Sequence, residues 1–327
     1  MHNGVTSFVQ LDIDLLKLSY SVDEWFARPR RIAPLRLWKA VRSHDLIFGW
    51  FASWHTFLPM LFARIAGVPA VLVTGGYDVA NLPEIGYGLQ RGGPAKWISR
   101  WTMRLSTRLI ANSRFSCLEA ESNAGIPAER VTVIYHGLPA GEFTSDPRER
   151  MALTVGNVTR PNLSRKGLEG FVRAAAFLPG VKFVLAGKWW DDSIGYLKSI
   201  AASNVEFPGR VNDRTLHDYY RRASVYVQVS QHEGFGMSLA EAMLEGCIPV
   251  VVRQGAIPEV VGDCGVYAAT RQGADVAEAI RTALGMGDSE RQRVRARVVN
   301  EFSLARRREA LETIVDSLLE TSDRRPH

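Results

Sequence analysis

The residues best suited to chemistry are two carboxylates, Glu233 and Glu241, that flank the segment Gly234-Phe235-Gly236. A strand-like apolar run precedes them and a helical pattern follows. Glycines let a backbone approach a ligand closely, and the start of a helix presents unpaired N–H groups with a partial positive charge. Carboxylates accept hydrogen bonds from hydroxyl groups. The segment is therefore suited to an anionic ligand that also carries hydroxyls.

A second polar segment joins the first expected strand of the C-terminal half to its first helix. It contains Asn157 and, at the start of the helix, Arg165 and Lys166. A diphosphate placed there would meet two cations and the positive end of the helix. Both segments follow strands of one expected parallel sheet, and such sheets bind ligands at the carboxyl ends of their strands. We therefore expect Lys166 and Glu233 to open into one crevice that holds a pyrophosphate-linked sugar.

Each of these residues also has a simpler interpretation. Ser238 and Glu241 have the spacing of a capping box, in which the glutamate binds the backbone at the start of its own helix. Glu233 could be a solvated loop carboxylate. Arg165 and Lys166 could form an exposed basic turn.

Composition limits the class of protein. The formal charge is +6 and the pI about 9.3, which suits an anionic partner, but no nucleic-acid-binding motif accompanies it. Three cysteines without CxxC or Cys/His spacing argue against a disulfide framework or a zinc site. With neither a signal peptide nor a good membrane span, we expect a cytoplasmic protein, with contact at the inner membrane surface left open.

One basic stretch bears on that membrane contact. Arg100, Arg104 and Arg108 recur every fourth residue beside Trp97 and Trp101. A helix of this kind could lie on an anionic membrane. The alternative is a solvated helix whose tryptophans are buried in the core.

Short β-branched runs alternate with helical stretches, which predicts βαβ units and parallel sheets. The expected strands are 45–49, 70–74, 108–111, 131–134, 152–156, 181–187, 204–207, 225–229, 248–252 and 265–267, with a weaker one at 22–26. The expected helices include 6–18, 31–41, 55–65, 94–105, 115–124 and 304–320.

The chain divides into two expected domains. Residues 1–145 form the first and 146–302 the second, with a polar linker at 141–150. Residues 303–327 form a C-terminal helix expected to cross back to the first domain. No strand-like run precedes the first helix, so either the start is truncated or this domain has lost its first strand.

Together these motifs resemble glycosyltransferase family 4, also called glycosyl transferases group 1. Glu233 to Glu241 resembles its E-x7-E signature and Lys166-Gly167 its KG pair. The segments 133–137, 208–211, 246–251 and 255–261 resemble further motifs of the family. The resemblance is dense from Val131 to Tyr267 and loose before it.

The resemblance implies an α/β protein of the GT-B fold, with two Rossmann-like, doubly wound domains that face a cleft. It implies that Glu233 binds hydroxyls of the transferred sugar and that Gly234, Phe235 and Gly236 offer backbone N–H groups. Glu241 would hold the ribose.

The same resemblance implies that Arg165 and Lys166 neutralise the diphosphate and that Arg210 and Val211 flank the base. Such enzymes transfer a hexose from a UDP- or GDP-linked donor with retention, and they need neither a metal ion nor a cofactor. The acceptor is unidentified, and the process would be polysaccharide or glycolipid synthesis.

Two positions depart from the family pattern. Asn157 stands where the family often has a phosphate-binding arginine, and a glycine stands where it commonly has a histidine near the reacting carbon. Asp78 and His55 are the nearest polar candidates on the acceptor side. Asp78 could instead cap a turn, and His55 could be a core histidine.

Three competing functions remain open. One is a nucleotide-sugar binding module without turnover, which the missing strand and histidine would suit. The others are a nucleotide-sugar epimerase of the same fold, although epimerases lack the paired glutamates, and a pyridoxal-dependent phosphorylase, normally a longer chain.

Overall fold

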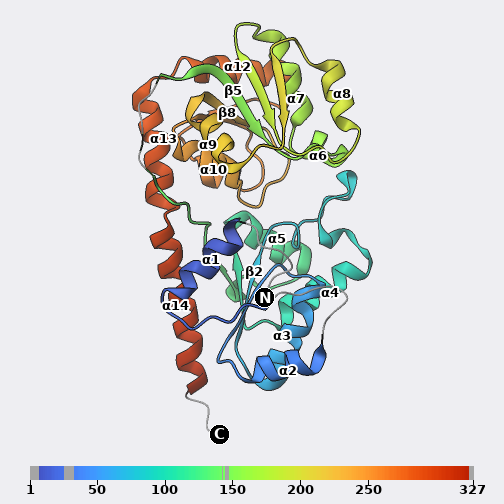
Figure 1. Cartoon of the computed structure of the whole chain (residues 1–327). Coiled ribbons are helices and arrows are strands. Elements are labelled where there is room, and N and C mark those ends of the chain that lie inside the picture. Colours follow the sequence, from blue (N-terminus) through green and yellow to red (C-terminus); the bar gives the residue numbers. More distant parts are fainter. Residues whose placement is uncertain (1–6, 26–32, 142, 144–146, 324–327) are drawn as a thin grey trace. The chain divides into compact units, whose positions relative to one another are not determined.

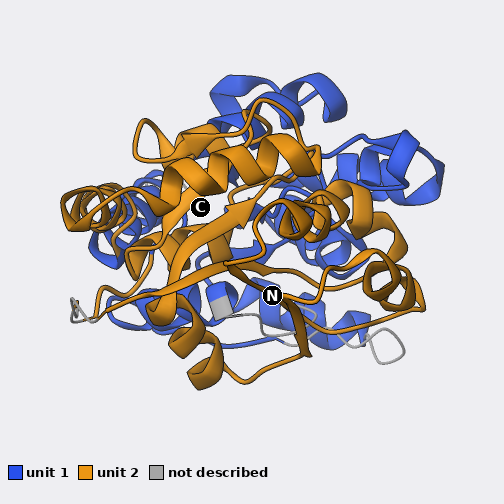
Figure 2. Ribbon diagram, turned by 90° about the horizontal axis from the view of Figure 1, so that it is seen from above, with its two compact units in different colours: residues 1–137, 304–327 blue, residues 138–303 orange. Residues whose placement is uncertain are grey.

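The strands form two separate parallel sheets, and the chain divides with them into two units (Figure 2). Unit 1 comprises residues 1–137 and 304–327, and unit 2 comprises residues 138–303. The first boundary therefore falls at Gly137, earlier than the expected 145. The computed structural model describes residues 7–25, 33–141, 143 and 147–323.

The sheet of unit 1 has four parallel strands in chain order: β1 (Ile47–Trp50), β2 (Ala70–Thr74), β3 (Arg108–Ala111) and β4 (Val131–Val133). Every residue of β2 is buried, as expected for a central strand that helices cover on both faces. No described strand precedes β1, so the described part of this sheet contains no reversal of strand order.

Successive side chains of β2 point to opposite faces of this sheet and therefore show which helices cover each face. Leu72 belongs to a core cluster with residues of α2, α3 and α4, whereas Val71 and Val73 belong to another with residues of the first and last helices. The helices of unit 1 are α1 (Ser7–Lys17), α2 (Pro34–Arg42), α3 (Trp54–Ala66), α4 (Gly93–Leu105), α5 (Arg114–Ala124) and α14 (Leu304–Asp323). Helices α1 and α14, from opposite ends of the chain, lie side by side (Figure 1).

A buried ion pair holds α14 to the rest of unit 1. Arg307 Nη2 donates to Asp12 Oδ2 over 2.7 Å, and both side chains are almost fully buried. Trp50 Nε1 donates to the same carboxylate oxygen over 2.9 Å, and Arg307 Nη1 donates to the carbonyl of Tyr135 over 2.8 Å. The C-terminal helix is thus fixed by polar contacts as well as by its apolar face.

The sheet of unit 2 reverses its strand order. Its strands are β5 (Glu149–Val155), β6 (Lys182–Ala186), β7 (Val205–Gly209), β8 (Ala223–Gln228), β9 (Ile248–Val251) and β10 (Val266–Tyr267). They are parallel and run β10-β9-β8-β5-β6-β7 across the sheet. The chain builds outward from β5 to β7, then returns to place β8 on the other side of β5. The neighbours β5 and β8 therefore form a topological switch point, where doubly wound sheets bind their ligands.

Eight helices are described in unit 2: α6 (Arg160–Arg165), α7 (Leu168–Ala174), α8 (Ser193–Ile200), α9 (Asp213–Arg222), α10 (Met237–Leu244), α11 (Ile257–Val261), α12 (Gly273–Leu284) and α13 (Asp288–Glu301). Short 3₁₀ turns occupy Pro83–Ile85, Leu89–Arg91, Ala128–Arg130 and Ala175–Phe177.

Most expected elements form within a few residues of their predicted bounds, but the weak strand at 22–26 is wrong. Val22 to Trp25 form no strand, and Phe26 lies outside the described residues, as do Thr6 and Arg31 at the starts of two expected helices. The expected linker at 141–150 overlaps β5, which begins at Glu149. Among the described helices, none combines the length and apolar character needed to cross a bilayer.

Candidate nucleotide-sugar site

The segment after β5 contains a helix that the sequence analysis missed. Helix α6 starts at Arg160, where the Thr159 side chain caps it by accepting from the Asn162 backbone N–H, and ends at Arg165. Lys166 follows, and Gly167 then adopts a left-handed conformation (φ 69°) before α7. A Cβ on Gly167 would lie 2.4 Å from the carbonyl oxygen of Val229, so glycine lets this turn approach the end of β8.

Backbone contacts join this turn to the segment after β8. The Gln231 N–H donates to the carbonyl of Arg165 over 2.6 Å, and Arg165 Nη1 donates to the carbonyl of His232 over 3.3 Å. Arg165 Nε donates to Asn162 Oδ1 over 3.0 Å. The two segments predicted to bind one ligand are therefore in direct contact.

Their charged side chains meet at Glu233. Lys166 Nζ donates to Glu233 Oε1 over 2.9 Å, Ser230 Oγ donates to the same oxygen over 3.0 Å, and Arg165 Nη1 lies 3.8 Å from it. The three charged side chains are only 10–18% exposed. The interpretations of a solvated loop carboxylate and an exposed basic turn are therefore wrong.

The two cations also set the charge of this carboxylate. Burial alone would raise the pKa of Glu233, but Lys166 and Arg165 outweigh burial, and the net pKa is below the usual glutamate value. Glu233 is thus an ionised acceptor held between two cations beside the switch point.

The turn at Gly255 and Ala256 contacts the backbone of Glu233. The Ala256 N–H donates to the Glu233 carbonyl over 3.0 Å. Gly255 has a positive φ of 58°, and a Cβ there would lie 2.8 Å from the backbone N and O of Glu233. This turn belongs to the segment 255–261, which resembles a motif of the family, and it fixes the backbone of the glutamate loop.

Helix α10 begins directly after the glycine-bearing loop. Its N-cap is Gly236 (φ 98°) and its first residue is Met237. Phe235 is buried with its ring edge-to-face against Phe302, centroids 5.3 Å apart. Gly234 is half-buried. The aromatic side chain anchors the loop, and the start of α10 lies beside it.

Glu241 lies in the second turn of α10. The helix begins before Ser238, and Gly236 makes no side-chain cap, so the capping-box interpretation is wrong. Glu241 Oε2 instead accepts from the Tyr220 hydroxyl of α9 over 3.0 Å. Burial raises the pKa of Glu241, while the Tyr220 hydrogen bond acts in the opposite direction. Sequence reasoning missed Tyr220, because nothing local links it to this helix.

The remaining predicted donor residues also lie after carboxyl ends of strands in this sheet. Asn157 follows β5 with an exposed side chain, and its carbonyl accepts from Asn162 Nδ2 over 2.8 Å. Arg210 and Val211 directly follow β7, the edge strand. No hydrogen bond or ion pair between described residues links Arg210 or Val211 to Glu233.

An exposed aromatic pair that the sequence analysis passed over lies near Arg210. Trp189 and Trp190 follow β6 and are 39% and 61% exposed. The Trp189 indole lies 3.7 Å from the position of a Cβ on Gly209. Two adjacent tryptophans after an apolar strand were the signal that could have identified this surface.

The two acceptor-side candidates lie in unit 1, and both are buried. The carboxylate of Asp78 accepts from the backbone N–H groups of Ala52 (2.8 Å) and Gly75 (2.9 Å). His55 Nε2 lies 2.9 Å from the Trp50 carbonyl oxygen. Both are 2% exposed, and burial raises the pKa of Asp78. These contacts favour the alternatives, a turn-fixing aspartate and a core histidine.

Within the described part of the chain, no three or more His, Cys, Asp or Glu side chains gather in a way that could hold a metal ion. The ionic groups of the site are the lysine, the arginine and the glutamates described above.

Comparison with known proteins identifies the family. A family model described as "Glycosyl transferases group 1" matches residues 149–286, and one described as "Glycosyltransferase Family 4" matches residues 13–141. The chain belongs to the group 1, family 4-like glycosyltransferases. The matched ranges fall almost entirely in unit 2 and unit 1, respectively.

Relatives and solved structures of this glycosyltransferase agree with that assignment. The chain is 27% identical over 213 residues to alpha-galactosylglucosyldiacylglycerol synthase of Streptococcus pneumoniae, covering 58% of this chain and 54% of that protein. It is 27% identical over 254 residues to the lipopolysaccharide core biosynthesis mannosyltransferase LpcC of Rhizobium leguminosarum bv. viciae, covering 68% and 67%. The chain spans about half the length of the first curated relatives it matches.

The solved structure of Anabaena HepE in complex with UDP-glucose has a TM-score of 0.74 at 18% identity, covering 97% of this chain and 98% of that one. The fold is accordingly GT-B, with a Rossmann-like, doubly wound sheet in unit 2 and a shorter parallel sheet in unit 1.

Proposed function

We propose that this glycosyltransferase transfers a hexose from a UDP- or GDP-linked donor to an acceptor hydroxyl, with retention and without a metal ion or cofactor. The observation that carries the proposal is the contact of Lys166 and Arg165 with Glu233 beside the β5/β8 switch point. This arrangement places two cations and a hydroxyl-binding carboxylate within one cluster. A pyrophosphate-linked sugar presents the matching groups.

In the proposed reaction, the bond between the anomeric carbon and the diphosphate oxygen breaks, and a bond to the acceptor oxygen forms on the same face. The acceptor proton passes to the departing phosphate. Negative charge therefore grows on the diphosphate, where Lys166, Arg165 and the start of α10 would stabilise it. A preorganised donor at such a position contributes about 3 kcal/mol to the transition state.

The other residues would hold the rest of the donor. Glu233 accepts hydrogen bonds from sugar hydroxyls, and Glu241, oriented by Tyr220, accepts from the ribose. The loop at Arg210 and Val211 flanks the base. Trp189, partly exposed beside Gly209, offers a stacking surface for the same base.

We propose further that the acceptor belongs to glycolipid or polysaccharide synthesis and that unit 1 contacts the inner membrane surface. The named relatives act in such processes by their descriptions. Trp97 and Trp101 of α4 are 56% and 52% exposed, so the prediction of tryptophans in the core is wrong. Exposed tryptophans between arginines suit the headgroup region of an anionic bilayer.

The direct test is release of UDP or GDP from a panel of nucleotide sugars in the presence of diacylglycerol, glycolipid and saccharide acceptors. The wild type should form a product whose anomeric configuration matches that of the donor. Lys166→Ala should lower kcat about 10²- to 10³-fold. Its matched control is Lys182→Ala, because Lys182 starts β6, at the amino ends of the strands of the same sheet, and among the described residues it pairs with the half-exposed Glu206.

Three outcomes would contradict the proposal. Donor binding without turnover under every acceptor condition would favour the binding module, and interconversion of free nucleotide sugars would favour an epimerase. Equal activity of Lys166→Ala and Lys182→Ala would show that the cation cluster takes no part in the mechanism.

A further inference from the structure

A cavity in unit 1 lies at the edge of the sheet opposite to the candidate acceptor residues. Its volume is about 300 Å³. Pro69 precedes β2, Thr107 precedes β3 and Arg130 precedes β4, so the cavity opens at the amino ends of three strands. The end of α3 and residues Leu318 and Thr321 of α14 complete its wall. It is therefore separate from the carboxyl edge of this sheet, and the inference below does not rest on the proposed transferase activity.

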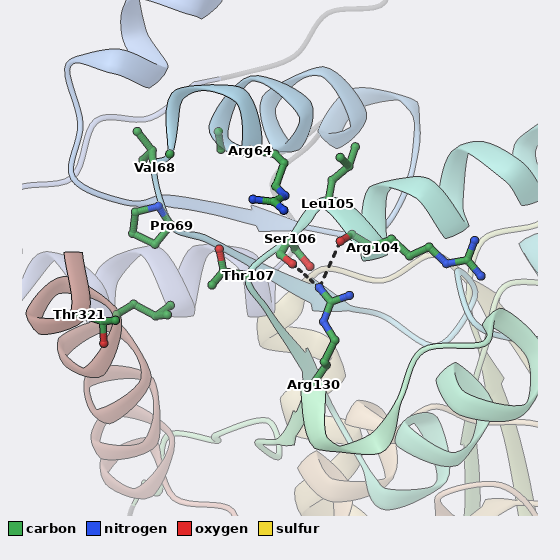
Figure 3. A pocket seen from close by; sticks show the side chains of 12 residues that line it. Arg64, Val68, Pro69, Arg104, Leu105, Ser106, Thr107, Arg130 and Thr321 are labelled. Carbon is green, nitrogen blue, oxygen red and sulfur yellow. Dashed lines mark hydrogen bonds between the residues drawn. The ribbon is translucent and has the colours of Figure 1, made fainter. Parts of the chain in front are cut away.

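Two guanidinium groups face this cavity from different elements. Figure 3 shows Arg64 of α3 and Arg130 extending toward the same space, whereas Arg104 contributes its backbone carbonyl and directs its side chain away. Arg130 Nη2 donates to the carbonyls of Arg104, over 3.2 Å, and Ser106. These bonds fix one side of the Arg130 group and leave its other N–H donors for a ligand.

No described carboxylate forms an ion pair with Arg64 or Arg130, and no acidic residue lines the cavity. Thr107 Oγ1 accepts from the Ala70 N–H over 3.0 Å, so its own hydroxyl hydrogen can be donated. The donors that the cavity offers to a ligand are therefore those of Arg64, of Thr107 and of the second side of Arg130.

Positive charge dominates three helices of unit 1, whereas α14, which completes the wall of the cavity, carries Asp316 and Glu320 next to Leu318 and Thr321 in the sequence. Helices α2, α3 and α4 contain no Asp or Glu, while their basic residues are Arg36, Lys39, Arg42, Arg64, Lys96, Arg100 and Arg104. Burial lowers the pKa of Arg130, and the neighbouring cations Arg108 and Arg64 lower it further. Glu129 acts in the opposite direction, but the net pKa is below the ordinary arginine value. The chain therefore holds repelling cations together, and a bound anion would offset that repulsion.

We propose that the cavity between Arg64 and Arg130 binds a phosphate group. Two planar guanidinium groups and a hydroxyl donor match the oxygens of a phosphate, which arginine binds with paired hydrogen bonds. The volume is at the lower end of that of small-molecule sites, enough for a phosphate with a short polar substituent. The phosphate could belong to a lipid headgroup or to a free phosphate compound. Exposed Trp97 and Trp101, on the helix that leads to the cavity, favour the headgroup.

The test compares Arg64→Gln with Arg36→Gln. Both positions are exposed arginines on helices of unit 1 and lose the same charge, but only Arg64 lines the cavity. One arm titrates inorganic phosphate by calorimetry in a Lys166→Ala background, which weakens phosphate binding at the donor site. The other arm measures co-sedimentation with mixed phosphatidylglycerol–phosphatidylcholine vesicles and with pure phosphatidylcholine vesicles.

Arg64→Gln should raise the dissociation constant about tenfold in at least one arm, as expected for loss of a charged hydrogen bond, and Arg36→Gln less than about twofold. Arg130→Gln should repeat the Arg64→Gln result, with a circular dichroism spectrum to confirm folding. A tenfold loss for inorganic phosphate identifies a free phosphate site, and a loss confined to the anionic vesicles identifies a headgroup site. The proposal is overturned if Arg64→Gln and Arg36→Gln behave alike in both arms.

Discussion

The two units use buried charge in different ways. In unit 1, Asp12 pairs with Arg307, and Asp78 accepts from two backbone N–H groups, so both carboxylates are fully engaged in holding segments of that unit together. In unit 2, Glu233 binds two cations on one loop, and Glu241 binds one tyrosine. The partners of Glu233 lie after the carboxyl ends of β5 and β8, where a ligand can share them, whereas Asp12 and Asp78 are buried inside unit 1 with their partners.

Sheet topology explains the difference. The described strands of unit 1 run in chain order, while those of unit 2 reverse at β5 and β8. Doubly wound sheets bind their ligands at such a reversal, outside the carboxyl ends of the two strands. Lys166 follows one of these strands and Glu233 the other. Buried charges at that position should govern binding and turnover, and buried charges elsewhere should govern stability.

The largest expected effect is on stability, in unit 1. Arg307→Met leaves the carboxylate of Asp12 buried without its cation, which should lower the free energy of unfolding by about 3–5 kcal/mol. Urea unfolding followed by tryptophan fluorescence would measure it. The double variant Asp12→Asn with Arg307→Met should recover part of the loss. A loss below about 1 kcal/mol for the single variant would mean that the pair does not hold α14 in place.

The next largest effect is expected at Asp78, where a structural role and a catalytic role predict different results. Asp78→Asn replaces one acceptor oxygen by a donor that faces a backbone N–H, which should cost about 1–3 kcal/mol of stability. Turnover per folded molecule should remain that of the wild type. If kcat instead falls about 100-fold while the unfolding midpoint is unchanged, Asp78 is catalytic, as the sequence alone predicted.

A smaller effect is expected at Tyr220. Tyr220→Phe removes the hydroxyl that orients Glu241, so the affinity for UDP or GDP should fall about fivefold, or about 1 kcal/mol. Tyr219→Phe, on the same helix, is the matched control. Isothermal titration calorimetry would distinguish them. Identical nucleotide affinities for the two variants would contradict the proposed role of Glu241 in ribose binding.

The pH dependence tests the charge of Glu233. Its pKa in the folded protein is below the ordinary value of 4.5, so its stabilising contribution is complete above that value and is lost as the pH falls through the lower, folded pKa. Glu233→Gln should therefore unfold with a shallower loss of stability below pH 4.5 than the wild type. Glu278→Gln, which removes an exposed carboxylate, should keep the wild-type profile. A profile for Glu233→Gln that matches the wild type would argue against an ionised, paired Glu233.

Local patterns were sufficient for the strands and for part of the site. The runs 70–74 and 108–111 coincide with β2 and β3, because short runs that are mostly apolar are typical of buried parallel strands. The meeting of Lys166 with Glu233 followed from the rule that loops at carboxyl ends of one sheet converge.

Partners brought together by tertiary packing could not be predicted in this way. Tyr220 meets Glu241 only because α9 packs against α10, and Arg307 meets Asp12 across nearly the whole chain. The spacing of Ser238 and Glu241 favoured a capping box, but the positive φ of Gly236 allows the helix to start earlier. Asp78 and His55 were singled out as polar residues after strands, and sequence could not tell that both are buried against backbone groups.

The most direct measurement is a crystal structure with bound UDP or GDP. We predict that the terminal phosphate lies within hydrogen-bonding distance of Lys166 Nζ or of the Arg165 guanidinium, at the carboxyl ends of β5 and β8, with the ribose at Glu241. A nucleotide found at any other edge of either sheet, with the Lys166–Glu233 contact undisturbed, would contradict the assignment of the donor site.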